Sequence, residues 1–373
     1  MIREMFLYPW DVWEEGQEKV ADELAQMRIR SVSVAALYHQ ARLLLPHNPL
    51  NKLKMHPGGS LHVPFRENAY SRLKPRRGAD IQPERWQGMI DALKSRGIAV
   101  TAWAVLLHNS FLASAFPQFS IVNVYGDHLP SNLCPSSPEV QAYLEQIVKD
   151  IAATGVEQID IESLDYAGFL HGDHHEMQAY LDTVSLNRLL GLCFCPSCME
   201  NARRHGIDAE GLKRQLHSAA DAFLEMKPVE IASVPALREY DAMRCDRITE
   251  LYQVICTAAG IPVRPILWAA NGAEPVLSGV DTKRMGMEEV IACYPDDPEQ
   301  VSAFVKRIRS MTGDAVRITG GIRLLAPHTV RTEQVVIWEQ MYREAHVDRV
   351  IYYQYGMAPQ PYLDALKAKE DTI

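Results

Sequence analysis

Three carboxylates close together form the part of this sequence best suited to chemistry. They lie in GVEQIDIESLDYAG at positions 155–168, which begins like a buried strand and then carries Asp160, Glu162 and Asp165. Alternate side chains of a strand share a face, so Asp160 and Glu162 point the same way. Neighbouring carboxylates repel each other and burial disfavours ionisation, so one can stay protonated near neutral pH as a general acid. The structural alternative gives Asp160 an arginine partner and places Glu162 in an ion-pair network.

Two further clusters have residue types that bind metals. HGDHHEM, which begins at His171, offers imidazole and carboxylate ligands for a divalent ion, but it lacks the spacing of a helical zinc motif. A polar loop that contacts substrate through His171 is the favoured interpretation. CFCPSC places Cys193, Cys195 and Cys198 close enough to ligate a structural zinc, with Cys134 or a histidine as the fourth ligand. Reduced cysteines packed at a helix start are the alternative.

Eight short β-rich runs must position these residues. They lie near Met5, Ser31, Ile98, Val156, Val263, Glu289, Ala315 and Arg349. Stretches with helical spacing lie between most of the runs, and this alternation predicts a parallel sheet. Eight repeats without a glycine-rich dinucleotide turn after the first strand favour an α/β fold of the (β/α)8 TIM-barrel type. Barrel enzymes hold their catalytic groups at the carboxyl ends of the strands, where Glu162 is expected.

We expect residues 1–373 to form a single barrel domain with two long insertions. The connection at residues 38–97, after strand 2, is rich in proline, histidine, asparagine and glycine, and is interpreted as an ordered, lid-like loop. The connection at residues 166–261, after strand 4, is mostly helical in pattern. Long connections in compact domains are commonly functional, so both are expected over the catalytic face.

A resemblance supports this interpretation over about forty residues. The run at residues 132–169, from NLCPSSPEV to LDYAGF, resembles the passage from strand 3 to strand 4 in glycoside-hydrolase-like TIM barrels. By that match Glu162 occupies the position of the catalytic carboxylate. A weaker similarity to the chitinase-type strand retains only Asp160 and Glu162, so the chitinase mechanism is not implied. The cysteine trio with an earlier Cys134 is similar to the zinc site of some bacterial barrel β-galactosidases, although the intervening length differs.

Glycoside hydrolysis usually needs a second carboxylate. Asp296 follows strand 6, Glu274 follows strand 5 and Asp11 ends strand 1. Barrels with a strand-4 nucleophile and a strand-6 acid favour Asp296, although PDDPEQ is also typical of a helix N-cap.

Sugar sites combine aromatic platforms with polar hydrogen-bonding groups, and the expected strand ends supply both. The candidates for substrate binding are Trp10, Asp11, Tyr38, His39, His108, Asn109, Asp165, His171, Asn271, Glu274, Tyr294, Arg323 and Gln354. Trp103 and Trp268 fall inside their strands and are assigned to packing.

Composition limits the partners. The net charge of −9 and the scattered basic residues argue against nucleic acid, and no stretch approaches the ~20 apolar residues of a membrane span. An odd number of cysteines and a start without signal-peptide features predict a cytoplasmic protein. Its assembly state stays open between a monomer and a homo-oligomer.

We therefore expect a glycoside hydrolase-like enzyme that acts on a small oligosaccharide or glycoside, needs no cofactor for catalysis, and uses Glu162, Asp160 and Asp296. The alternatives are a metal-dependent sugar isomerase or aldolase, and a non-catalytic carbohydrate-binding barrel.

Overall fold

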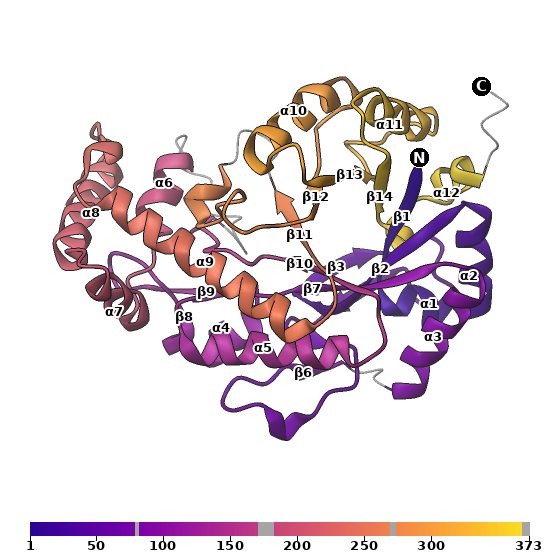
Figure 1. Cartoon of the computed structure of the whole chain (residues 1–373), viewed down its shortest axis with the longest axis horizontal. Helices are drawn as coiled ribbons and strands as arrows, with labels where there is room; N and C mark the ends of the chain where they lie inside the picture. The colour runs from indigo at the N-terminus through magenta and orange to yellow at the C-terminus, as the bar shows by residue number, and fades with distance from the viewer. Residues whose placement is uncertain (79–81, 171–182, 269–273, 368–373) are drawn as a thin grey trace.

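Eight parallel strands form a closed barrel, as the sequence predicts. The computed structural model describes residues 1–78, 82–170, 183–268 and 274–367 (Figure 1). The barrel strands are β1 (Ile2–Leu7), β2 (Ile29–Tyr38), β7 (Ala99–Val105), β10 (Gln158–Glu162), β11 (Val263–Trp268), β12 (Glu289–Cys293), β13 (Arg317–Arg323) and β14 (Arg349–Tyr353). Each strand pairs with its neighbours in chain order, and β1 pairs with both β2 and β14, which closes the sheet.

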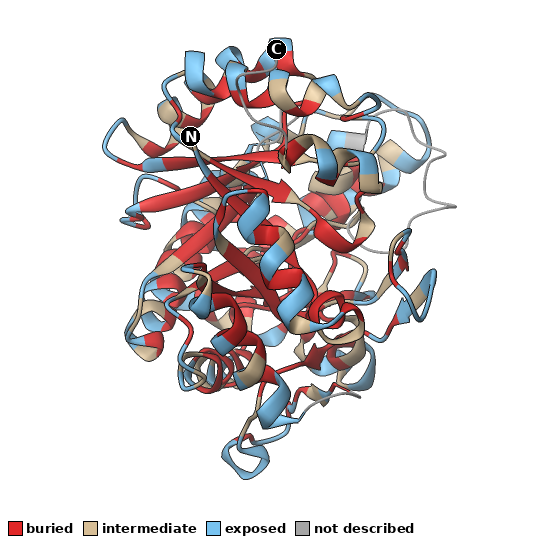
Figure 2. Ribbon diagram, turned by 90° about the vertical axis from the view of Figure 1, so that its right-hand side faces the viewer, coloured by how far each residue is buried: buried red, intermediate tan, exposed pale blue. Residues whose placement is uncertain are grey.

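Amphipathic helices surround the strands. Around the barrel lie α1 (Pro9–Glu15), α2 (Gln17–Gln26), α3 (Pro83–Ser95), α4 (Ser110–Ala115), α5 (Pro138–Ala152), α9 (Leu237–Ala259), α10 (Val301–Thr312), α11 (Glu333–Glu344) and α12 (Gln360–Lys367). In α5, Val140, Leu144, Ile147 and Ile151 recur at helical spacing and are buried. Figure 2 shows the result: the barrel strands are mostly buried, while the outer helices keep an exposed face. Among the described residues no helix is both long and apolar enough to cross a membrane.

The connection between β2 and β7 contains regular structure. An antiparallel hairpin joins β3 (Ala41–Leu44) to β4 (Leu53–His56). Then β5 (Ser60–Leu61) extends the sheet antiparallel to β2, β6 (Arg76–Arg77) pairs with β5, and α3 returns the chain to the barrel. The first residues of the hairpin lie at the mouth of the barrel, where Ala41 and Arg42 line a cavity.

The connection between β10 and β11 is helical in its described part. It contains α6 (Thr183–Leu190), α7 (Pro196–Arg204), α8 (Ala209–Leu224) and then α9. Helices α6 to α8 project to one end of the molecule (Figure 1) and bury their own apolar cluster, which includes Leu189, Leu212 and Leu216. The start of α9, with Leu237, Tyr240 and Met243, belongs to the same cluster, and α9 then packs along α5 in the ring around the barrel.

Shorter elements complete the fold. A second hairpin pairs β8 (Ser120–Val122) with β9 (His128–Leu133) ahead of α5. The 3-10 helices are Glu67–Ala69, Pro117–Phe119, Ile231–Ser233, Pro275–Ser278, Pro298–Gln300 and Tyr355–Met357.

Candidate active site

Two adjoining cavities open at the carboxyl ends of the barrel strands. The larger, of about 880 Å³, is lined by residues 39–42, by the end of β10 and by the end of β11. The smaller, of about 170 Å³, is lined by Phe6, Tyr38, His39, Trp103, Glu162, Ile266, Trp268, Tyr294, Arg323 and Tyr353. His39, Glu162, Ile266 and Trp268 line both cavities, so the two spaces meet at Glu162. The smaller cavity is several times the volume of a water molecule, which occupies ~30 Å³ in the liquid, so it has room for a small ligand group.

Glu162, the last residue of β10, is held by two indole groups. Trp103 on β7 donates its Nε1–H to Oε2 at 2.8 Å, and Trp268 on β11 donates to Oε1 at 3.1 Å. The pKa of Glu162 is raised to about 7, because the effect of burial is larger than the lowering by the two indole hydrogen bonds. A carboxyl group with this pKa can donate or accept a proton near neutral pH.

A second carboxylate, Asp165, lies three residues beyond Glu162. It lines the larger cavity, and burial raises its pKa to about 6, although the positive charge of Arg244 and a hydrogen bond from Ser278 lower it. Its negative charge also raises the pKa of Glu162. Glu162 and Asp165 are the only carboxylates among the described residues that line the two cavities.

Aromatic rings line the smaller cavity together with Glu162. Tyr8 donates its hydroxyl hydrogen to Tyr38 at 2.9 Å, and its oxygen lies 3.2 Å from that of Tyr353. The ring of Phe6 lies 4.9 Å from that of Trp103, and Tyr353 contacts both rings edge-on. Flat apolar surfaces with hydroxyl groups at their edges suit the C–H faces of a sugar.

Histidines and a cation complete the walls. His39 and His108 stack with ring centres 4.6 Å apart beside the larger cavity. Burial lowers the pKa of His39, so its ring is neutral at physiological pH. The guanidinium of Arg323 lies over the ring of Tyr294 at 4.8 Å in the smaller cavity.

Asp160 is placed differently from the sequence-based expectation. It lies fully buried inside the barrel, where Arg264 on β11 binds both of its oxygens at 2.7 and 2.9 Å and Ser33 donates to it at 2.6 Å. Arg264 also contacts Glu4 at 2.8 Å and Glu289 at 3.3 Å. This geometry favours the structural alternative for Asp160. The carboxylate that raises the pKa of Glu162 is Asp165, whereas the charge of Asp160 is paired with Arg264.

Asp11, Trp10 and Gln354 form a buried group beneath the mouth. The sequence places Asp11 at the end of strand 1, but the structure places it in the first turn of α1. It accepts hydrogen bonds from the backbone N–H of Tyr8 and from the side chain of Gln354, and burial raises its pKa to about 7. Trp10 stacks on Tyr8 at 4.6 Å. These side chains support the aromatic wall and do not line either cavity.

Other expected site residues lie elsewhere. Asp296 and Glu274 are exposed and line neither cavity, and the helix N-cap in PDDPEQ is Asp297, which accepts from the backbone of Gln300. Asn109 caps α4 through the backbone N–H of Leu112. His171 and Asn271 fall outside the described residues, as does the rest of the HGDHHEM segment.

Sequence reasoning missed the two tryptophans that bind Glu162 and also Tyr353. Trp103 and Trp268 were assigned to packing because they fall inside strands. The strand register shows the inward orientation of Trp103: it pairs with Asp160 across β7 and β10, so its side chain faces the interior as Asp160 does.

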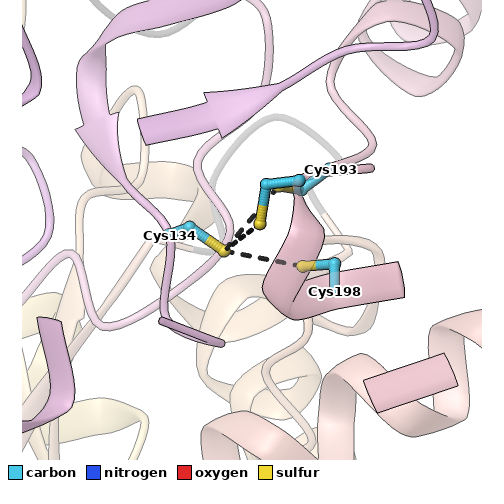
Figure 3. A group of neighbouring side chains, drawn as sticks. Cys134, Cys193 and Cys198 are labelled. Carbon is cyan, nitrogen blue, oxygen red and sulfur yellow. Dashed lines mark hydrogen bonds between the residues drawn. The ribbon is translucent and has the colours of Figure 1, made fainter. Parts of the chain in front are cut away.

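The four cysteines converge, as the sequence suggests. Figure 3 labels three of them, Cys134, Cys193 and Cys198. Cys134 follows β9, Cys193 and Cys195 precede α7, and Cys198 lies within it. All four are buried, their sulfurs lie within 4.8 Å of one another, and Cys134 is 3.5 to 3.7 Å from the other three. Zinc at ~2.3 Å from four tetrahedral sulfurs separates them by ~3.8 Å, so the cluster fits this ion.

Comparisons with known proteins agree with the fold. No family model and no curated relative matches the sequence. Among solved structures, a β-galactosidase from the psychrophilic Marinomonas ef1 superposes with a TM-score of 0.60 at 11% identity, over 98% of this chain and 58% of that one. α-L-Fucosidase isoenzyme 2 from Paenibacillus thiaminolyticus gives a TM-score of 0.59 at 11% identity, over 98% and 48%.

A third similar structure is a β-N-acetylhexosaminidase, with a TM-score of 0.53 at 12% identity, over 100% of this chain and 73% of that one. This chain spans about half to three fifths of the length of the β-galactosidase and the fucosidase. The likeness shows the fold: a TIM barrel like those of glycoside hydrolases.

Proposed function

We propose that this chain is a glycoside hydrolase that cleaves a glycosidic bond in a small oligosaccharide or glycoside, with Glu162 as the general acid. The observation that carries the proposal is a carboxyl group with a pKa of about 7 where two cavities meet at the carboxyl ends of the strands. A general acid is most effective when its pKa lies near the operating pH. The glycosidase folds of the similar structures support the same class.

In the proposed reaction a sugar ring occupies the smaller cavity and the leaving group extends into the larger one. Glu162 lines both, so it is placed to protonate the oxygen between them. The two indole groups hold the carboxyl group in one orientation. Asp165 takes the role of the second carboxylate, in place of Asp296, because it is the other carboxylate of the described cavity walls.

We further propose that the cysteine cluster holds one structural zinc ion. Four protein ligands leave no open position for water, so the ion would supply folding stability and no chemistry at Glu162. It would tie the loop after β9 to α7, where the backbone N–H of Phe194 already donates to Val122 of β8 at 2.7 Å.

A panel of neutral and acidic aryl glycosides in both anomeric forms tests the proposal. We expect hydrolysis of at least one of them, and a loss of turnover of at least ~10²-fold in Glu162→Gln. The matched control is Glu157→Gln, because Glu157 lies just before the same strand, with its side chain 53% exposed. No turnover on any glycoside, together with measurable sugar binding, would favour a carbohydrate-binding barrel instead.

A further inference from the structure

The end of β13 brings a cation into the smaller cavity. Arg323 lines this space together with Glu162, and its guanidinium carbon lies 4.8 Å from the ring centre of Tyr294 and 5.9 Å from that of Tyr353. Cation–π contacts with these two rings favour this position of the guanidinium. The proposed mechanism leaves this side chain without a role.

His328 contacts Arg323 and does not neutralise its positive charge. Nδ1 of His328 lies 3.3 Å from the carbonyl oxygen of Pro295, and its Nε2 lies 3.3 Å from Nη1 of Arg323. A carbonyl oxygen can only accept, so Nδ1 carries the proton and Nε2 accepts from Arg323. A neutral imidazole therefore positions the guanidinium, which keeps its full charge.

The charge of Arg323 has no partner in the described parts of the chain. No carboxylate among those residues lies within ion-pair distance of it, and its buried Nε–H has no hydrogen-bond acceptor there. Glu162, the only described carboxylate lining the smaller cavity, is engaged by the two indoles. An unpaired, partly buried charge is costly, and such groups are commonly kept to bind a ligand of opposite charge.

The chemistry of glycoside cleavage also indicates that the ligand carries a negative charge. Cleavage of a glycosidic bond passes through a transition state in which the sugar ring gains positive charge. A guanidinium beside that ring disfavours this state unless an anion stands between them. A carboxylate, phosphate or sulfate on the sugar itself would accept two parallel hydrogen bonds from Arg323 and offset its charge.

We infer that the sugar bound in the smaller cavity carries an anionic group and that Arg323 binds this group. The inference rests on the proposed function only in taking a sugar as the ligand. The three anions share this chemistry, so the probes separate a uronic acid from a sugar phosphate and a sugar sulfate.

Binding of monosaccharides, which contain no glycosidic bond, tests the inference apart from turnover. Titration calorimetry would compare glucose and galactose with glucuronate, galacturonate, the hexose 6-phosphates and the hexose 6-sulfates. At least one anionic sugar should bind about tenfold to a hundredfold more tightly than its neutral parent, the range of a hydrogen bond to a charged group. Arg323→Gln should abolish this preference, and Arg323→Lys should restore part of it. The control is Arg203→Gln, an exposed position on α7.

The outcomes separate the two proposals. Equal binding of neutral and anionic sugars, absence of binding by every probe, or a preference that survives in a folded Arg323→Gln protein would overturn the inference. Hydrolysis of neutral glycosides alone would overturn it too and leave the proposed function standing. An Arg323-dependent preference in a protein that hydrolyses no glycoside would uphold the inference and remove the proposed function.

Discussion

The two indole bonds to Glu162 set how strongly this residue holds its proton. Each N–H stabilises the ionised carboxylate, so each bond lowers a pKa that burial has raised to about 7. Of the two donors, Trp268 is the better one to remove, because 47% of its surface is exposed while Trp103 lies in the core.

Trp268→Phe should move the pKa of Glu162 upward, and the alkaline limb of the pH–rate profile with it, by up to about one pH unit. The sign follows because loss of a donor to the ionised form favours the protonated form. Rates measured from pH 5 to 9 check this shift, with Trp13→Phe as control because the indole of Trp13 binds the backbone of Arg85 outside the site. A limb that moves to lower pH would contradict the assigned role.

At the scale of elements, charges inside the barrel connect strands that are far apart in sequence. Arg264 on β11 contacts Asp160 on β10, Glu4 on β1 and Glu289 on β12. Removing one partner of a buried cation lowers stability by more than the intact pair contributes, because the cation is left buried without its counter-charge.

Asp160→Asn should therefore lower the free energy of unfolding by roughly 3–5 kcal/mol, toward the lower end because Glu4 and Glu289 remain. Urea unfolding measures the change, and Asp22→Asn, at an exposed pair with Arg96, serves as control. A stable Asp160→Asn protein with an altered pH–rate profile would instead return Asp160 to the active site.

The cysteine cluster brings the loop after β9 next to the start of α7. Protein purified without added metal should contain about one zinc per chain, and Cys198→Ser should lose the ion and several kcal/mol of unfolding free energy. The control is Cys256→Ser, because Cys256 lies outside the cluster. Metal content near background in the unmodified protein, with thiols that titrate in the folded state, would dismiss the zinc site.

At the scale of the whole molecule, the mouth of the barrel makes stability depend on pH. Burial raises the pKa of Glu162 to about 7, of Asp11 to about 7 and of Asp165 to about 6, each above its value in an unfolded chain. For these three groups the folded state holds more protons than the unfolded state, so their contribution to stability falls as pH rises from about 4 to about 7. The buried imidazoles of His56 and His62, whose pKa values burial lowers to about 4 and about 3, act in the opposite direction.

Glu162→Gln should consequently gain stability relative to the unmodified protein between pH 4 and pH 8, by about 2 kcal/mol once partial solvent access is allowed for, because only the carboxyl group ionises in that range. Chemical unfolding at the two pH values measures this difference. A stability difference between the two proteins that is the same at both pH values, or that moves against Glu162→Gln from pH 4 to pH 8, would mean that the carboxylate ionises without cost in the fold.

The sequence predicted the barrel well because strand and helix periodicity are local. All eight strands and the position of Glu162 at the end of β10 follow from alternation and chain order. Contacts across the barrel were not predictable in this way. The partner of Asp160 lies 104 residues away at Arg264, and the two tryptophans of Glu162 come from different strands. Asp296 was a misleading candidate because helix capping and catalysis favour the same residue type after a strand; here the capping residue is Asp297, and Asp296 is exposed.

Proton donation by Glu162 is the central claim, and its dependence on the leaving group tests it most directly. The measurement is turnover of the unmodified protein and of Glu162→Gln on aryl glycosides whose phenols span a wide range of acidity. A general acid matters most when the departing oxygen is basic, so Glu162→Gln should lose ~10²–10⁴-fold with a weakly acidic phenol and far less with a dinitrophenol. An equal loss across all leaving groups, or no loss with any, would contradict the assignment of Glu162 as the proton donor.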